Sequence, residues 1–167
     1  MPATPAQTLA TELATALATL PRFSTLDPAT VPAAVAALVA DNERAIEALL
    51  DEAGPPSWDG LCARIDDYND RLNRLWSPVR HLHSVADTDA LRAAYAEAMP
   101  TVVRYGTAQM QNDRLCAAYR HLLDAPAFAT LSPARQQVIR HAVRDFRLGG
   151  IELDPAQRER FSAIQQR

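Results

Sequence analysis

The sequence contains no lysine, few glycines and few aromatic residues. All seventeen of its basic residues are arginines, glycine occurs five times in 167 residues, and aromatic residues make up 6% of the chain. Alanine, by contrast, accounts for about one residue in five. Because alanine is the best helix former and glycine is among the worst, this composition favours helices. The exclusive use of arginine is typical of a coding bias rather than of one function.

Two further shortages exclude classes of protein. Cys62 and Cys116 are too few for a disulfide framework, and both lie in apolar helical patterns where a free thiol behaves as a small buried hydrophobe. The net charge of −3 gives no reason to expect nucleic acid or an anionic membrane as a partner. No basic leader opens the sequence, and no apolar stretch approaches the ~20 residues that span a bilayer. The sequence therefore predicts a cytoplasmic protein.

Signals for helix starts and stops recur along the chain after residue 22. Residues 1–22 are rich in alanine and threonine and are predicted to be a separate arm, either a loose helix or an unstructured segment. Five helical runs follow, with caps expected at Thr30, Ser57, Asp87–Asp89, Ser132 and the Asp154–Gln157 capping box. Pro100 should kink or split the third run, and Gly149-Gly150 should stop the fourth. Without any strand-like alternation, the sequence predicts an all-α, antiparallel bundle of about five to six helices.

Apolar residues in these runs predict which faces are buried. The second run has the most regular stripe, formed by Leu61, Ile65, Tyr68, Leu72, Leu75, Val79 and Leu82. Three carboxylates lie off this stripe and predict a solvated face rather than a catalytic pair: Asp66, Asp67 and Asp70. The first run has its predicted apolar positions at Val31, Val35, Leu38, Val39, Ile46 and Leu49. The later predicted positions are Leu91, Tyr95, Met99, Val102, Val103, Met110, Leu115, Tyr119, Leu122, Leu123, Val138, Ile139, Ala142, Val143 and Phe146.

His81 and His83 raise the question of a metal site. Residues two apart on a helix point about 200° away from each other, so the two imidazoles cannot share a metal ion. A His-Glu-x-x-His pattern, which places two histidines on one face, does not occur in the sequence. We therefore expect both histidines at the end of the second helix, where an imidazolium suits the helix dipole.

The other reactive side chains have simpler interpretations. His121 and His141 are single histidines on helices, and Ser132 is expected to cap a helix. Ser77 and Ser84 lack the context of a nucleophile. The fourth run has a basic side, which an interface or internal ion pairs would explain: Arg135, Arg140, Arg144 and Arg147. The residues thus predict no catalytic and no metal-binding group, and leave any substrate-binding residue undefined.

Five segments nevertheless resemble one family in their order and spacing. They are FSTLDPATVPAAV, SWDGLCARIDDYNDRLNRLWSPVRHLHSV, LRAAYAEAMP, LCAAYRHL and AVRDFRLGGIEL. Together they resemble the N-terminal region of the oligopeptidase A and thimet oligopeptidase family of zinc metallopeptidases, from about residue 22 to residue 167. The segments WSPVRHLHSV and RDFRLGGIEL are the most specific.

The resemblance implies an almost entirely helical enzyme that hydrolyses short peptides inside a deep channel. In such enzymes zinc is held by the His-Glu-x-x-His motif and a further glutamate, downstream of the matched region, so no metal or catalytic residue is carried over to this chain. Its helices would form part of the channel wall, and the chain would be inactive alone. Its implied partners are the remainder of the peptidase and, in the whole enzyme, short peptides.

The last predicted helix reaches residue 167 without a stop signal, and we expect residues 23–167 to be a region truncated inside that helix. An isolated region would expose apolar surface and self-associate. An alternative interpretation is a free-standing helical module, derived from such a peptidase, that binds peptides or another protein.

Overall fold

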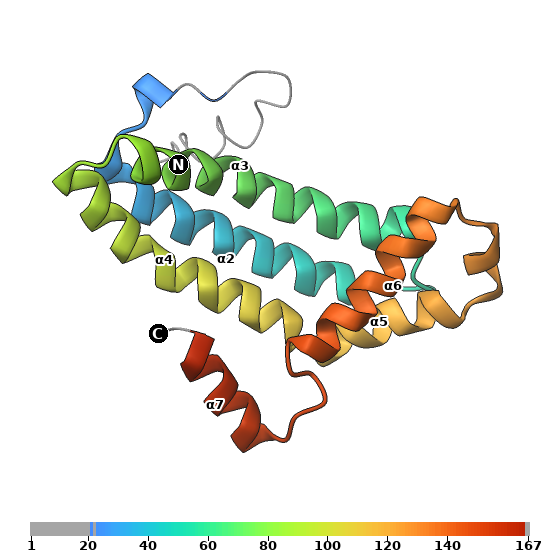
Figure 1. Cartoon of the computed structure of the whole chain (residues 1–167). Helices are drawn as coiled ribbons and strands as arrows, with labels where there is room; N and C mark the ends of the chain where they lie inside the picture. Colours follow the sequence, from blue (N-terminus) through green and yellow to red (C-terminus); the bar gives the residue numbers. More distant parts are fainter. Residues whose placement is uncertain (1–20, 22, 166–167) are drawn as a thin grey trace. The chain divides into compact units, whose positions relative to one another are not determined.

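The computed structural model describes residues 21 and 23–165, and in this part of the chain every regular element is helical (Figure 1). The long helices are α2 (Val31–Leu50), α3 (Ala63–Val85), α4 (Asp89–Met110), α5 (Asp113–Asp124), α6 (Pro133–Leu148) and α7 (Pro155–Gln165). Short 3-10 helices η1 (Phe23–Thr25), η2 (Pro28–Thr30) and η4 (Pro126–Thr130) and a π-helical turn η3 (Trp58–Cys62) lie between them. The predicted all-α fold is confirmed. The arm predicted over residues 1–22 lies outside the described residues, apart from Pro21.

Several predicted helix ends are confirmed. Each depends on contacts between neighbouring residues, which the sequence can predict. The Ser57 hydroxyl accepts a hydrogen bond from the Gly60 amide at the start of η3, at 2.9 Å. Ser132 caps α6, with Pro133 at the first helical position. Gly150 follows α6 with a φ of +87°, a conformation that only glycine adopts without strain.

Other predicted ends were wrong. Thr30 does not cap α2; its hydroxyl donates to the Asp27 carbonyl, and Asp27 caps the short helix η2 that leads into α2. The α4 cap is the Thr88 hydroxyl, which accepts from the Leu91 amide, rather than Asp87 or Asp89.

Pro100 does not split α4, which runs unbroken from Asp89 to Met110. Proline removes one hydrogen bond from a helix, but Ala98 and Tyr105 on either side of Pro100 are buried and hold the helix in place. The break comes instead after Met110, where the Asn112 side chain accepts from the Leu115 amide and starts α5. The Asn-Asp pair at this point is the sequence signal that predicts such a cap.

The chain divides into two compact units, one comprising Met1–Ala45 with Asp66–Val102 and the other Ile46–Ile65 with Val103–Arg167. In the first unit, the α2 residues Val35 and Leu38 and the α3 residues Leu75 and Val79 are at most 2% exposed. Trp76, which lies beside the predicted stripe, is also buried. Its ring stacks on that of Tyr95 from α4, with centroids 5.0 Å apart.

The α4 face in this unit was partly mispredicted. Met99 is 36% exposed, whereas Ala94 and Ala98 are buried. Alanine occurs on every side of these helices, so its position alone did not show which alanines face the core.

The second unit is centred on α5 and α6. Phe146 is 1% exposed and contacts the Tyr119 ring, with centroids 5.7 Å apart. Ile139 is fully buried on the same face of α6. Val138, which was predicted to share this face, is 49% exposed because it lies one residue, or about 100°, around the helix from Ile139.

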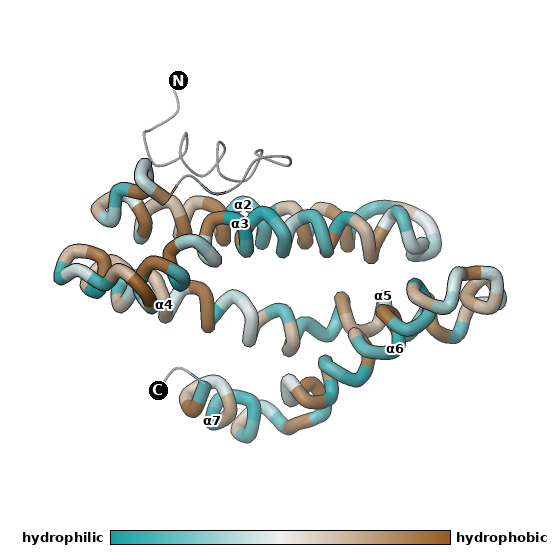
Figure 2. Tube along the Cα trace, turned by 45° about the horizontal axis from the view of Figure 1, so that its top comes forward, coloured by the Kyte–Doolittle hydropathy of each residue, from teal (hydrophilic) through white to brown (hydrophobic). Residues whose placement is uncertain are grey.

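Apolar and hydrophilic positions are interleaved along α6 and α7 (Figure 2). Among the described residues no helix is both long enough and apolar enough to cross a membrane.

Candidate functional site

His81 and His83 lie near the end of α3, as predicted, and their rings have different partners. The His81 ring packs against Phe23, with centroids 5.2 Å apart. The His83 ring stacks on Tyr95 at 4.1 Å, which extends the Trp76–Tyr95 stack to three rings. The two imidazoles therefore contact separate aromatic groups, and their role in this part of the chain is packing.

The donor groups do not fit a zinc ion in the described part of the chain. Nowhere in residues 21 and 23–165 do three or more His, Cys, Asp or Glu side chains come together in a way that could hold a metal. His121 and His141 are both exposed, and the His141 ring is 2.6 Å from the Gln137 amide nitrogen. Because structural and catalytic zinc sites need at least three protein ligands, these residues offer no zinc centre.

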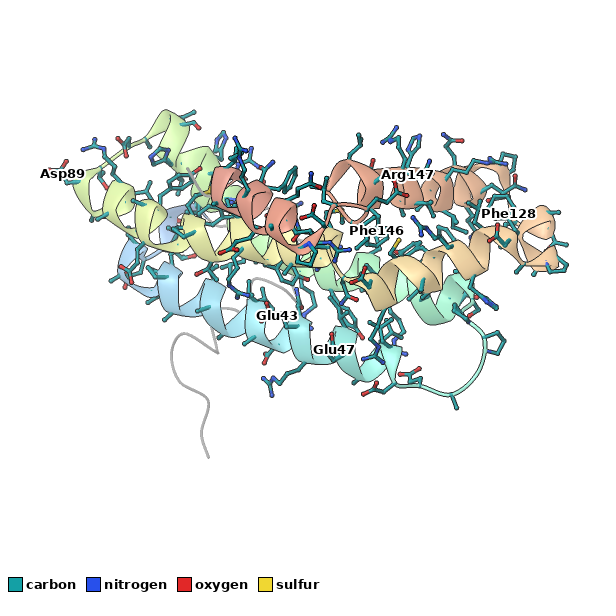
Figure 3. All side chains as sticks on the ribbon, turned by 90° about the horizontal axis from the view of Figure 1, so that it is seen from below. Glu43, Glu47, Asp89, Phe128, Phe146 and Arg147 are labelled. Atoms are coloured by element: carbon teal, nitrogen blue, oxygen red, sulfur yellow. The ribbon has the colours of Figure 1, made fainter. Side chains whose placement is uncertain are left out.

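The arginines on α6 are satisfied within the molecule. The Arg135 guanidinium lies 4.9 Å from the Trp58 ring centroid, and that of Arg140 lies 5.0 Å from the Phe128 ring. Arg144 pairs with Asp145 at 2.7 Å. Figure 3 shows that Phe146 and Arg147 leave α6 in different directions, Arg147 bonding to Glu152 at 3.0 Å. Internal ion pairs and ring contacts therefore account for the basic side of this helix.

The α3 carboxylates form the predicted solvated face. Asp66 and Asp67 are exposed, and Asp70 bonds to Arg74 one turn further along at 2.5 Å. Such exposed pairs within one helix contribute little to stability. They do not form a catalytic carboxylate pair.

A surface cavity of about 280 Å³ lies in the second unit beside Cys116. Its charged lining residues are already paired: Arg120 bonds to Glu152 at 3.0 Å, and Asp113 bonds to Arg158. The Arg147 and Arg120 guanidinium groups lower the pKa of Glu152, and Arg158 lowers that of Asp113. These carboxylates are therefore stable anions with fixed partners, and neither is positioned as a general base for the Cys116 thiol.

A second hollow, of about 130 Å³, follows the loop after α2 and includes Gly54, Pro55 and Ser57. Both volumes are below the roughly 300–1,000 Å³ of typical ligand pockets.

Both cysteines are buried free thiols, as predicted. Burial raises the pKa of Cys62 from 9.0 to about 11, although a hydrogen bond with Tyr119 acts in the opposite direction. Burial also raises the pKa of Cys116. Both thiols are therefore protonated at neutral pH and are poor nucleophiles.

We expect neither thiol to react with Ellman's reagent at pH 8 while the chain is folded, and both to react rapidly in urea. Rapid labelling of the native protein at this pH would contradict the burial of the thiols.

An unfolded thiol ionises at a lower pH than the folded Cys62 thiol, so alkali favours unfolding. The Cys62 contribution to the free energy of unfolding should be intact below about pH 9 and should fall as the pH approaches about 11. Replacing Cys62 by alanine should remove this pH dependence.

Comparison with known proteins connects this helical chain with peptidases. The family model described as "Neurolysin/Thimet oligopeptidase, N-terminal domain" matches residues 35–158. The chain is 37% identical over 145 residues to the oligopeptidase A of Salmonella typhimurium and 36% identical over 145 residues to that of Escherichia coli. A probable cytosolic oligopeptidase A of Arabidopsis thaliana is 32% identical over 146 residues.

Each of these alignments includes 87% of this chain but 21% of the relative. The chain thus spans about a fifth of the length of the curated relatives that it matches. The match confirms the family resemblance of the five sequence segments, and α2 to α6 all lie within or overlap the matched region. The chain belongs to the neurolysin/thimet oligopeptidase family, whose N-terminal domain it carries.

Proposed function

We propose that this chain is the N-terminal, channel-wall part of a zinc metallo-oligopeptidase that hydrolyses short peptides in the cytoplasm. The observation that carries this proposal is the match of residues 35–158 to the family's N-terminal domain. The names of the relatives support a peptidase activity for the whole enzyme. In this proposal the chain shapes the access of peptides and does not itself hydrolyse them.

The residue types in the sequence support the proposal that hydrolysis takes place in another part of the enzyme. The sequence has no His-Glu-x-x-His motif, which holds zinc and supplies the general base in such enzymes. The described donor groups offer no alternative zinc centre. Zinc and the catalytic glutamate would therefore come from the remainder of the peptidase.

The long helices have dimensions suited to a channel wall. The 20 residues of α2 form a rod roughly 30 Å long, and α3 and α4 are slightly longer. An extended peptide of about eight residues spans roughly 27 Å, which is similar to the length of these helices. Rigid helices of this length can therefore flank a whole short peptide.

Peptide hydrolysis by the purified chain tests the proposal. We expect no cleavage of an internally quenched fluorogenic peptide by the chain, with or without added zinc, and no stoichiometric zinc by metal analysis. Escherichia coli oligopeptidase A under the same conditions is the positive control. Zinc-dependent turnover by the chain alone would refute the proposed division of labour. Saturable peptide binding by the chain alone would instead favour a free-standing binding module.

A further inference from the structure

Helix α7 is held at its beginning by a dense set of polar contacts. The Asp154 carboxylate accepts from the Gln157 amide at 2.9 Å, and the Gln157 side chain accepts from the Asp154 amide at 3.4 Å, forming the predicted capping box. Arg158 donates two hydrogen bonds to the Asp113 carboxylate of α5, at 3.0 and 3.1 Å, and others to the Ile151 and Leu153 carbonyls. The position of α7 within the second unit is thus fixed by polar anchors rather than by a buried apolar face.

The apolar side of α7 is only partly covered by the described residues. None of the 11 residues of this helix is fully buried: Phe161 is half-buried, and Ile164 is 57% exposed. Helices shorter than about 12–15 residues are marginal in water and are normally stabilised by burying an apolar face. The structure therefore shows an anchored helix with less apolar burial than a helix of this length usually depends on.

Arg160 and Ile164 are four residues apart, so they lie on the same face of α7. Both are exposed, and Arg160 makes no ion pair with the described part of the chain. This face combines an apolar side chain with an unpaired positive charge. A complementary surface would offer an apolar contact for Ile164 and a carboxylate for Arg160.

We propose that this face of α7, marked by Arg160 and Ile164, is a docking surface for the remainder of the peptidase polypeptide. The inference rests on the proposed function and specifies where the domain meets its partner. The relatives support this choice of occupant, because about four-fifths of their length lies outside the aligned 21%. The start of α7, up to residue 158, lies inside the region matched by the domain model.

Amide hydrogen exchange of α7 tests the proposal in two proteins. One is the chain itself, and the other is Escherichia coli oligopeptidase A in which this chain replaces the region it matches. We expect the amides of residues 156–165 to exchange at least roughly tenfold more slowly in the chimaera than in the chain, because docking suppresses local opening. Ile164→Glu and Arg160→Glu should each abolish most of this difference. Val85→Glu, at a similarly exposed position on α3 (65%), is the matched control and should preserve it.

Equal exchange of α7 in the chain and the chimaera would overturn the docking proposal. If the wild-type chain sediments as a dimer and Ile164→Glu makes it monomeric, a second copy is the occupant and the proposal is wrong. If deletion of residues 1–20 accelerates α7 exchange in the chain alone, the N-terminal arm is the occupant and the docking proposal is also wrong.

Peptide hydrolysis by the chimaera is a separate readout. A chimaera that protects α7 but cleaves no peptide would count against the proposed function and leave the docking surface supported. A chimaera that cleaves peptides but leaves α7 unprotected would support the proposed function and count against the docking surface.

Discussion

Replacing Phe146 by alanine is expected to lower the free energy of unfolding by roughly 3–5 kcal/mol. The Phe146 side chain is 1% exposed and is the largest fully buried side chain among residues 21 and 23–165. Its removal would eliminate the ring contact with Tyr119 and leave a cavity between α5 and α6. Urea denaturation followed by circular dichroism at 222 nm measures the change.

The control for this variant is Leu148→Ala on the same helix. Leu148 is 70% exposed, so its truncation should change the free energy of unfolding by less than about 0.5 kcal/mol. Similar losses for the two variants would contradict the orientation of α6 in the structure.

A charge introduced at Asn42 is expected to have the second large effect. Asn42 is fully buried, its side-chain nitrogen donates to the Tyr68 carbonyl at 2.7 Å, and its side-chain oxygen has no hydrogen-bond partner. Asn42→Asp preserves the shape but would place a carboxylate beside that carbonyl. We expect a loss of about 3–5 kcal/mol at pH 8, the cost of an unpaired buried charge.

The pH dependence of this variant separates charge from shape. Burial should raise the pKa of the introduced carboxyl above the value of about 3.9 that it has in the unfolded chain. Since the neutral form is favoured in the folded state, the variant should approach wild-type stability near pH 4 and lose stability as the pH rises. Urea denaturation of both proteins at several pH values between 4 and 8 measures the difference.

Asn42→Leu is the matched apolar control. It removes the unpartnered oxygen together with the donor, so its cost should be below about 1.5 kcal/mol and should not vary with pH. If Asn42→Asp and Asn42→Leu behave alike at pH 8, the side chain of residue 42 is not buried as the structure shows.

At the candidate site, the sequence predicted features that depend on neighbouring residues and missed contacts between distant ones. The sequence excluded a shared metal at His81 and His83 from helix geometry alone, but not the ring contacts with Phe23 and Tyr95. Those contacts join residues from different elements. The peptidase family was recognisable from the order of five segments, although none of them contains a catalytic motif.

By itself the sequence determined the all-α class and several helix ends, including those at Ser57, Ser132 and Gly150. These features depend on hydrogen bonds and backbone angles within a few residues, so spacing and residue type suffice to predict them. The tertiary structure alone decided that Asn42 is buried, that α4 continues through Pro100, and that Arg158 holds Asp113, which is 45 residues away. Each of these depends on which helix lies next to which, and an apolar pattern along one helix does not specify its neighbour.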